Sequence, residues 1–334
     1  MIIGGEEMVV NLVTGAGGFV ASHLIDYLLE KGETVYATYR WNEDLSRIQH
    51  IKDKITMIPA DLLDLTSMMN VITKSLPDYV FHLAAQSYVT DSFEYPQATI
   101  ETNTIGTLNL LEAIRRYRVK MFLDPVIHIC SSSEVYGQVE EKDIPIKETQ
   151  AFNPANPYAV GKIGADMLGL IYWKNYGLKV IRTRMFTHFA PRRTMKSAEV
   201  NFASQIAMIE EGLQEPVIKH GNLDSIRTWA DARDAVKAYW LLVRKCKPGE
   251  VYNIGGNRTE TVEWVLNHLI SLSHVDIDTE QDPSLLRPSD VTLQIPDISK
   301  FQKETGWEPT YKLEQSLQDL LNWCRKEVKN GKRF

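Results

Sequence analysis

The sequence predicts an α/β protein: a doubly wound parallel sheet with a smaller α/β lobe in the second half of the chain. In the first half, short and almost continuously apolar runs alternate with segments of helical periodicity, which is typical of parallel strands covered by helices on both faces. A glycine-rich turn at residues 15–18, between the first run and the first helical segment, is the second observation. Because parallel crossovers are right-handed, the doubly wound (Rossmann) topology is the economical arrangement of these elements.

Six apolar runs are predicted as parallel strands. They cover residues 8–13, 34–38, 55–58, 79–83, 126–130 and 179–184. Val20, Leu24 and Leu28 recur at helical spacing after the first strand, and a longer helix is predicted over about 103–117. After about residue 186 prolines interrupt shorter elements, which indicates a looser lobe. The expected domains are a Rossmann domain at 8–185, to which 224–255 returns, and a second lobe at 186–223 and 256–334.

The composition is that of an ordinary globular protein. Hydrophobic residues make up 44% and charged residues 24% of the 334 residues, enough apolar material for a sizeable core. The net charge is −6 without a basic cluster, which argues against nucleic acid or a membrane surface as partner. No apolar run approaches the ~18 residues of a membrane helix, and no signal peptide is predicted. Three scattered cysteines predict neither disulfides nor a metal site, so we expect a soluble cytoplasmic protein without a metal.

The segment Thr14-Gly-Ala-Gly-Gly-Phe-Val-Ala21 has the pattern of a dinucleotide-binding turn. Gly15 and Gly18 permit a tight turn and close approach of the backbone to a pyrophosphate, and Ala21 suits close packing of helix and strand. The helix N-terminus that follows offers free amide groups and the positive end of a dipole to the phosphates. A purely structural glycine turn is the alternative. The loop residues expected at the cofactor are Gly15, Gly17, Gly18, Phe19 and Val20.

The residue after the second strand bears on the identity of the cofactor. NAD sites usually have an acid there for the ribose 2′-hydroxyl, whereas this sequence has Arg40, whose guanidinium can pair with a 2′-phosphate. We therefore expect NADP; a solvated surface cation is the alternative for Arg40, and the nearby acids Glu43 and Asp44 keep NAD possible. Asp61 is expected to accept from the adenine amino group, with a helix N-cap as the alternative. Residues at the ends of the third and fourth strands complete this site: Asp61, Leu62, Leu83, Ala84 and Ala85.

Tyr158 and Lys162 are expected on the first turns of one helix. Asn156 is placed as its N-cap and Pro157 at its first position, so that Tyr158 and Lys162, four residues apart, share a face. A nearby ammonium favours the phenolate, so we expect Lys162 to lower the pKa of Tyr158 and make it a usable acid and base. The serines of 131–133 end the fifth strand at the edge where such sheets bind ligands, and one hydroxyl there can hydrogen-bond the reacting oxygen.

Taken together, these motifs resemble the extended short-chain dehydrogenase/reductases that act on nucleotide sugars. Within them the sequence is similar to the GDP-mannose 4,6-dehydratases and the related GDP-4-keto-6-deoxymannose reductases. The resemblance spans nearly the whole chain, through the stretches TGAGGFVASHL, HLAAQSYV, SSSEVYG, PYAVGK and GWEPTYKLEQSL. Further features that carry it are Ala85-Gln86-Ser87, Pro191-Arg192-Arg193, Gly221-Asn222-Leu223-Asp224 with Arg227, and Arg287-Pro288-Ser289-Asp290.

The resemblance implies four catalytic residues. Ser132, Tyr158 and Lys162 match the triad of the family, with Ser132 standing where these dehydratases usually carry Thr. Glu134 matches the dehydratase carboxylate that exchanges the C5 proton, which suits the chemistry because a 4-ketone acidifies the neighbouring C5 hydrogen. For Glu134 an N-cap or a surface carboxylate is the alternative.

The resemblance also implies residues that bind the nucleotide sugar in the second lobe and beside it. Thr187 replaces the usual Asn of its motif, and Asn201 falls where GDP-mannose dehydratases typically have a Lys at the guanine. Arg227 and Arg287 are candidates for the diphosphate, because a guanidinium fork suits phosphate oxygens, with a surface salt bridge as the alternative for both. His188 is either a nicotinamide contact or a packed cleft residue. The expected substrate residues are Ser87, Thr187, Asn201, Arg227, Arg287 and Asp290.

From these features we expect an NADP-dependent nucleotide-sugar 4,6-dehydratase acting on GDP-mannose or a related GDP-hexose or GDP-heptose. A GDP-4-keto-6-deoxy-sugar reductase, or a 4-dehydrogenase or epimerase on the same scaffold, is the first alternative. A non-catalytic dinucleotide-binding regulator is the second. The paired arginines that bridge subunits in the dehydratases are here Arg40-Trp41, and family habit points to a homodimer on paired helices or a homotetramer.

Overall fold

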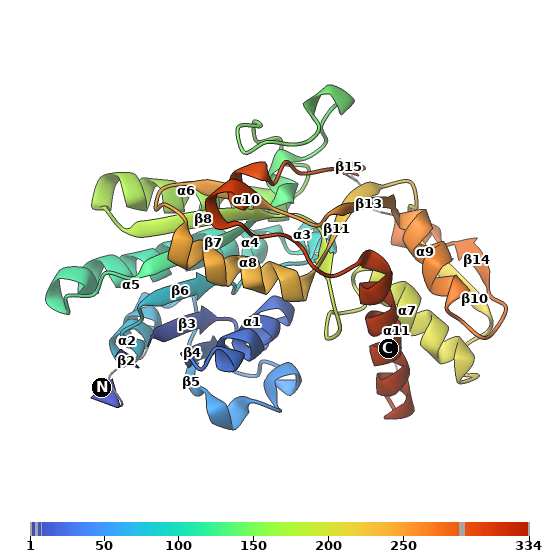
Figure 1. The fold of residues 1–334 in the computed structure, drawn as a ribbon, viewed down its shortest axis with the longest axis horizontal. Coiled ribbons are helices and arrows are strands. Elements are labelled where there is room, and N and C mark those ends of the chain that lie inside the picture. Colours follow the sequence, from blue (N-terminus) through green and yellow to red (C-terminus); the bar gives the residue numbers. More distant parts are fainter. Residues whose placement is uncertain (1, 4–5, 8, 287–290, 333–334) are drawn as a thin grey trace.

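The computed structural model describes residues 2–3, 6–7, 9–286 and 291–332. Its centre is a seven-stranded sheet in the order β12-β8-β7-β6-β3-β4-β5, in which every neighbouring pair is parallel (Figure 1). The predicted doubly wound α/β fold is therefore confirmed. The strands of this sheet are β3 (Val10–Thr14), β4 (Thr34–Tyr39), β5 (Thr56–Pro59), β6 (Tyr79–His82), β7 (Val126–Ser132), β8 (Lys179–Met185) and β12 (Val251–Ile254).

Helices cover both faces of this sheet, as continuous apolar strands require. One face packs against α1 (Phe19–Glu30), α8 (Ala232–Lys245) and α10 (Ser299–Thr305), which share one buried core. The other face packs against α2 (Leu65–Ser75), α5 (Gly106–Lys120) and α6 (Pro157–Tyr176) around a second core. Further elements of the first 100 residues are β1 (Ile2–Ile3), β2 (Glu6–Glu7), α3 (Val89–Glu94) and α4 (Pro96–Ile100).

One strand and the start of one helix differ from the predicted elements. The seventh strand, β12, was not among the six predicted strands; it pairs with β8 at the edge of the sheet. The helix predicted from about residue 103 begins at Gly106, because a π-helical turn at Glu101–Ile105 precedes it. Asn103 on that turn accepts from the Gln86 amide at 2.9 Å and donates to the Gln86 carbonyl oxygen at 3.0 Å. These two bonds hold the chain that follows β6.

A second, smaller lobe holds its own core beside the carboxyl ends of the strands. Its helices α7 (Ala198–Glu210), α9 (Val262–Ser271) and α11 (Leu313–Lys329) bury one apolar cluster between them. Short strands complete it: β9 (His188–Phe189), β10 (Val217–His220), β11 (Ile226–Asp231), β13 (Arg258–Thr261), β14 (Asp278–Gln281) and β15 (Leu293–Gln294). Strand β11 pairs with β13, β15 and β9, and β10 pairs with β14. In the described part of the chain, no helix is long and apolar enough to cross a membrane.

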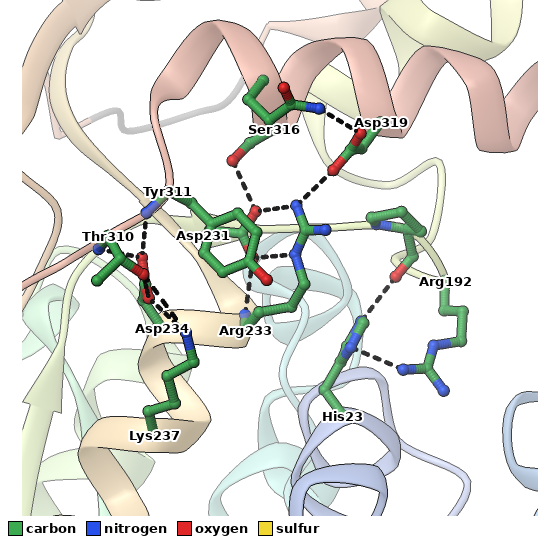
Figure 2. Close-up of polar contacts among 12 residues, drawn as sticks. His23, Arg192, Asp231, Arg233, Asp234, Lys237, Thr310, Tyr311, Ser316 and Asp319 are labelled. Carbon is green, nitrogen blue, oxygen red and sulfur yellow. Dashed lines mark hydrogen bonds and ion pairs between the residues drawn. The ribbon is translucent and has the colours of Figure 1, made fainter.

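Ion pairs join this lobe to the large sheet where β11 becomes α8 (Figure 2). Asp231 ends β11 and caps α8 through the Arg233 amide, at 2.7 Å. The Arg233 guanidinium bridges Asp231 at 2.7 Å and Asp319 of α11 at 2.8 Å, and Ser316 of α11 donates to Asp231 at 2.6 Å. Asp231 is only 3% exposed, so these partners are needed to hold its charge.

A second connection ties the start of the lobe to α1. His23 on α1 lies beside Arg192, whose Nη2 is 2.7 Å from His23 Nδ1 (Figure 2). The same Arg192 nitrogen lies 2.8 Å from the Asp26 carboxylate. The other nitrogen of His23 lies 2.9 Å from the Pro191 carbonyl oxygen. Because a guanidinium only donates and a carbonyl only accepts, His23 must be neutral with its hydrogen on Nε2. Burial lowers the pKa of His23 to about 4, in agreement with a neutral ring.

Candidate active site

The glycine loop after β3 has the geometry of a pyrophosphate site. Gly15 has a φ of +76°, and a Cβ there would lie 2.9 Å from the Ala84 backbone. A Cβ on Gly17 would lie 2.5 Å from the Asp44 carbonyl oxygen. Helix α1 then begins at Phe19 without a side-chain cap, so its first amides are offered to a ligand. At both positions the protein's own atoms leave no room for a side chain, so the turn stays tight before the uncapped amides of α1.

The turn after β4 brings a carboxylate as well as Arg40 to this loop. The Arg40 amide donates to Glu43 Oε2 at 2.8 Å, and the Glu43 carboxylate packs where a Gly17 side chain would lie. The Arg40 guanidinium is exposed and forms no ion pair within the described ranges. The positive charge of Arg40 is therefore available to a ligand. The Glu43 carboxylate lies beside it and would repel a negatively charged group such as a phosphate.

The ends of the third and fourth strands are shaped by backbone hydrogen bonds. Asp61 accepts from the Leu63 amide at 2.9 Å, whereas the N-cap of α2 is Asp64; the N-cap alternative for Asp61 is therefore wrong. The amides of Leu83 and Ala84 both donate to Thr14 Oγ1, at 3.1 and 3.0 Å. Two further expected cofactor residues lie near these ends: Leu62, packed against α5, and the half-buried Ala85.

Tyr158 and Lys162 lie on the first turns of α6, as predicted. Asn156 caps the helix by accepting from the Ala159 amide at 2.8 Å. Lys162 Nζ donates to the Cys130 carbonyl oxygen at 2.8 Å and lies 5.9 Å from the Tyr158 ring centroid. Ser132, Tyr158 and Lys162 are 8%, 8% and 7% exposed, so the three polar groups meet in a nearly dry setting at the end of β7.

The predicted lowering of the Tyr158 pKa by Lys162 is wrong for these residues by themselves. Burial raises the pKa of Tyr158 well above its ordinary value, and a hydrogen bond from Ser132 is the first influence that opposes it. Burial also lowers the pKa of Lys162. The reason is that the ammonium is turned to the Cys130 carbonyl oxygen and carries its own desolvation cost.

Arg193 is a charged group of this site for which no role was predicted. Its guanidinium lies 5.7 Å from the Phe19 ring centroid at the start of α1 and pairs with Glu199 of α7 at 3.3 Å. Its charge lowers the pKa of Tyr158 against the larger effect of burial. The pair Arg192-Arg193 in the motif after β9 was the signal that could have found it.

His188 packs against the same aromatic ring. The two rings are stacked at 6.1 Å with an interplanar angle of 19°. His188 Nδ1 is 3.0 Å from the Phe186 carbonyl oxygen, so it carries the hydrogen, and burial lowers the pKa of His188 to about 4. This neutral, half-buried ring lies against Phe19 at the start of α1, and its contact with a nicotinamide stays a prediction.

Glu134 does not cap a helix, so that alternative is wrong. The cap of its 3₁₀ turn is Ser132, whose Oγ accepts from the Glu134 amide at 3.2 Å. The Glu134 carboxylate instead accepts from Asn156 Nδ2 at 3.0 Å and from Gln294 Nε2 at 3.4 Å. Its negative charge also raises the pKa of Tyr158, after burial and Cys130. The carboxylate therefore belongs to the same cluster as the tyrosine.

The expected substrate residues are only partly brought to this cluster. Arg227 on β11 donates to Gln294 Oε1 at 3.1 Å and to the Val291 carbonyl oxygen at 2.8 Å. Asn201 of α7 accepts from Gln205 at 2.6 Å instead. Among the described residues, no hydrogen bond or ion pair joins Ser87, Thr187 or Asn201 to Glu134 or Tyr158. Two expected residues lie outside the described ranges: Arg287 and Asp290.

A parallel sheet with a glycine loop after its first strand and a Tyr-x-x-x-Lys helix beside a serine-ended strand defines an extended short-chain dehydrogenase/reductase. Comparison with known proteins narrows this class. The chain belongs to the GDP-mannose 4,6 dehydratase family, whose pattern matches residues 12–320. The resemblance inferred from the motifs is thereby confirmed.

Individual relatives cover almost the whole chain. It is 33% identical over 310 residues to the GDP-6-deoxy-D-mannose reductase of Pseudomonas aeruginosa, over 93% of this chain and 95% of the relative. It is 31% identical to the GDP-mannose 4,6-dehydratase of Vibrio cholerae, over 93% and 92%. A solved structure of RMD from Pseudomonas aeruginosa complexed with NADPH has a TM-score of 0.81 and 30% identity, over 96% of this chain and 100% of that one.

Proposed function

We propose that this protein is a nucleotide-sugar 4,6-dehydratase that converts GDP-mannose, or a related GDP-hexose or GDP-heptose, to the GDP-4-keto-6-deoxy sugar. The observation that carries the proposal is the Glu134 carboxylate, which lies with Ser132 and Tyr158 at the end of β7. Reduction of a ketone needs an acid on the oxygen and a hydride donor, whereas elimination needs an additional base at C5. The membership of the chain in a dehydratase family supports the same reaction.

We propose NADP as the cofactor. The glycine loop, with Gly15, Gly17 and Gly18 and the amides of Phe19 and Val20, suits a pyrophosphate, because a tight turn of glycines leads into a helix N-terminus without a side-chain cap. The exposed Arg40 guanidinium suits a 2′-phosphate, and Glu43 is the residue that keeps NAD as the alternative. When bound, the oxidised cofactor supplies a hydride acceptor for C4 that later returns the hydride to C6, and a positive charge that favours the Tyr158 phenolate.

The residues of the chain divide the proton transfers. The Tyr158 phenolate takes the proton of the C4 hydroxyl, with Ser132 holding the same oxygen. The 4-ketone acidifies C5, and Glu134 takes the C5 proton; the electron pair of that bond forms a C5–C6 double bond as the C6–O bond breaks. One of the two collected protons leaves with the C6 oxygen as water, and the other returns to C5. The substrate loses one water and no net hydride.

A 4-keto-6-deoxy-sugar reductase is the second candidate function. The Pseudomonas aeruginosa reductase among the relatives favours it, and Tyr158 and Lys162 suit the reduction of a 4-ketone as well. A 4-dehydrogenase or epimerase uses them as well, but leaves the carboxylate of Glu134 without a task. A regulator without catalysis is a further alternative, which the assembled Ser132, Tyr158 and Lys162 cluster argues against.

Mass spectrometry of the products separates these functions. The purified protein is incubated with GDP-mannose and a trace of NADP, without reductant. A product lighter by one water with unchanged total NADPH supports the dehydratase. Turnover only of a GDP-4-keto-6-deoxy sugar, with one NADPH consumed for each product, contradicts the dehydratase and establishes the reductase. Inertness toward both sugars contradicts the assignment to these GDP-hexoses.

We also propose a homodimer, alone or paired into a homotetramer. Ile100 on α4, Ile105 on the π turn, and Val160 and Ile171 on α6 are 37%, 43%, 44% and 46% exposed. Val160 and Ile171 are roughly three helical turns apart and therefore on one side of α6. Sedimentation should give at least twice the mass of the 334-residue chain, and lysine at both α6 positions should give the monomer; a monomeric wild-type protein contradicts this.

We propose a cytoplasmic location, because Cys130, Cys246 and Cys324 are all free thiols. A GDP-linked sugar is the proposed partner, with neither nucleic acid nor a membrane. Fractionation of cells with antibodies to the protein tests the location.

A further inference from the structure

We propose that two carboxamides, those of Asn156 and Gln294, are positioning residues that clamp the Glu134 carboxylate in the orientation needed at C5. This inference rests on the proposed function, in which Glu134 is the C5 base. Asn156 Nδ2 lies 3.0 Å from Glu134 Oε2, and Gln294 Nε2 lies 3.4 Å from Glu134 Oε1. Each oxygen of the carboxylate therefore has its own amide donor.

The orientation of the Asn156 carboxamide is fixed by its helix. Its Oδ1 accepts from the Ala159 amide at 2.8 Å, because Asn156 is the N-cap of α6. A backbone N–H can only donate, so the oxygen of the carboxamide must face the helix and the NH₂ group must face away. That NH₂ group meets Glu134, and Asn156 is 6% exposed, so water rarely competes for it.

The orientation of the Gln294 carboxamide is fixed by two other donors. Its Oε1 accepts from Ser133 Oγ at 2.9 Å and from Arg227 Nη1 at 3.1 Å. A guanidinium has no acceptor, so the carboxamide oxygen must face Arg227 and the NH₂ group must face Glu134. Gln294 is 2% exposed on the short strand β15, which pairs with β11 next to Arg227. If the carboxamide were flipped, its NH₂ group would face the donors of Ser133 and Arg227, and its oxygen would face the Glu134 carboxylate.

The clamp suits a base because both donors are neutral. A lysine or arginine in direct contact would hold the carboxylate as well, but would weaken it as a proton acceptor. Gln294 additionally links the base to Arg227, the expected diphosphate residue, through one carboxamide. Binding of the nucleotide and orientation of the base thus share a side chain.

The substitutions Asn156→Asp and Gln294→Glu test the clamp with little change of shape. Each keeps the acceptor oxygen, and Asp is as good an N-cap as Asn. Each replaces the NH₂ group with an oxygen that faces the oxygen of Glu134. We expect kcat for GDP-mannose to fall about 10- to 100-fold, part of the roughly 10²- to 10⁴-fold that acid–base catalysis contributes, with KM changed less than about threefold because the Arg227 contact is kept.

An isotope effect separates positioning from general damage. With GDP-mannose deuterated at C5, the isotope effect on kcat should rise in both variants, because removal of the C5 proton becomes slower. The matched control is Asn153→Asp, the same change in the preceding loop, where the carboxamide donates to the Gln138 carbonyl oxygen rather than to Glu134. Unchanged kcat, or a loss of kcat without a larger isotope effect than in the control, would overturn the proposal.

A measurement without substrate keeps this inference separate from the proposed function. In the ¹⁵N-labelled protein, the side-chain NH₂ hydrogens of Asn156 and Gln294 should exchange slowly with water and should lose this protection in Glu134→Ala. The NH₂ of Asn153 should be unaffected. Rapid exchange of either amide in the wild-type protein overturns the clamp even if the enzyme dehydrates GDP-mannose. Slow exchange in a protein inert to GDP-mannose means that the function, not the clamp, is wrong.

Discussion

Lys162 donates from Nζ to the carbonyl oxygen of Cys130 at 2.8 Å, which anchors the ammonium of α6 to the end of β7. The contact fixes where the positive charge lies relative to Tyr158, on the adjacent turn. It also explains why burial, rather than the lysine, dominates the tyrosine: the pKa of Tyr158 is raised and that of Lys162 is lowered, both by loss of water. The protein therefore holds Tyr158 and Lys162 in position, and a positive charge from a bound ligand is needed to lower the pKa of Tyr158.

Removal of the Tyr158 hydroxyl should abolish turnover and leave the cofactor bound. In Tyr158→Phe the ring remains packed on α6, and only the proton-transferring oxygen is lost. We expect kcat to fall by about 10²- to 10⁴-fold with the affinity for NADP changed less than about twofold, measured by steady-state kinetics and by calorimetric titration of the cofactor. Turnover at the wild-type rate would exclude Tyr158 from the chemistry.

Arg40→Ala should discriminate between the two nicotinamide dinucleotides. If the exposed guanidinium binds a 2′-phosphate, its loss removes a charge-assisted contact of about 1.5–3 kcal/mol for NADP and almost nothing for NAD. The dissociation constant for NADP should rise about 10- to 100-fold. Glu43→Gln is the matched variant, since it removes the opposing acid and should strengthen NADP. Equal losses for both cofactors in Arg40→Ala would point to NAD.

The stability of the protein should fall as the pH is lowered from 6.5 toward 4. Burial lowers the pKa of His23 and His188 to about 4 and that of His82 and His128 to about 3, against an ordinary value of 6.5. In that range the unfolded chain binds protons that the folded chain does not, so each histidine contributes a loss of about 1.4 kcal/mol per pH unit.

Urea unfolding at pH 7, 6 and 5 measures this dependence. His128→Gln should reduce the pH dependence of the free energy of unfolding by about 1.4 kcal/mol per pH unit, the contribution of one proton. The ring is buried, and its Nε2 lies 2.8 Å from Thr183 Oγ1. His50→Gln is the control, since its side chain is 54% exposed. A stability independent of pH between 7 and 5 would show that these histidines are not kept neutral by the fold.

The junction of the two lobes should be sensitive to one carboxylate and tolerant of another. Asp231→Asn keeps the cap of α8 but leaves the Arg233 guanidinium with Asp319 alone, and should cost about 3 kcal/mol in the free energy of unfolding. Asp319→Asn, at a carboxylate 27% exposed, should cost less than about 1 kcal/mol. Equal losses in chemical denaturation would contradict the role of burial.

The elements with strong patterns could be predicted from the sequence, and the parts set by long-range contacts could not. The glycine loop and the Asn156-capped helix follow local rules of turn and cap, and both are found where expected. Strand β15 has two residues, too few for any periodicity, and Gln294 on it meets Ser133 across a separation of 161 residues. No local rule relates two such positions.

The charges of the site were the least predictable. The spacing of Tyr158 and Lys162 gives a shared helical face, but not the Cys130 carbonyl oxygen that holds the ammonium. Arg193 contacts the Phe19 ring directly after Arg192, whose φ is +77°. Non-glycine residues rarely adopt this backbone conformation, and an arginine at this position does not predict it. Electrostatics depends on burial and on partners distant in sequence, so it required the structure.

In a 4,6-dehydratase, the hydride removed from C4 returns to C6 of the same sugar, and here Glu134 would exchange the C5 proton. GDP-mannose carrying deuterium at C4 follows that hydride when the product is examined by NMR. We expect a product with the deuterium in its 6-methyl group and with a solvent-derived hydrogen at C5. Retention of deuterium at C4, or its accumulation in reduced cofactor without a 6-deoxy product, would contradict it.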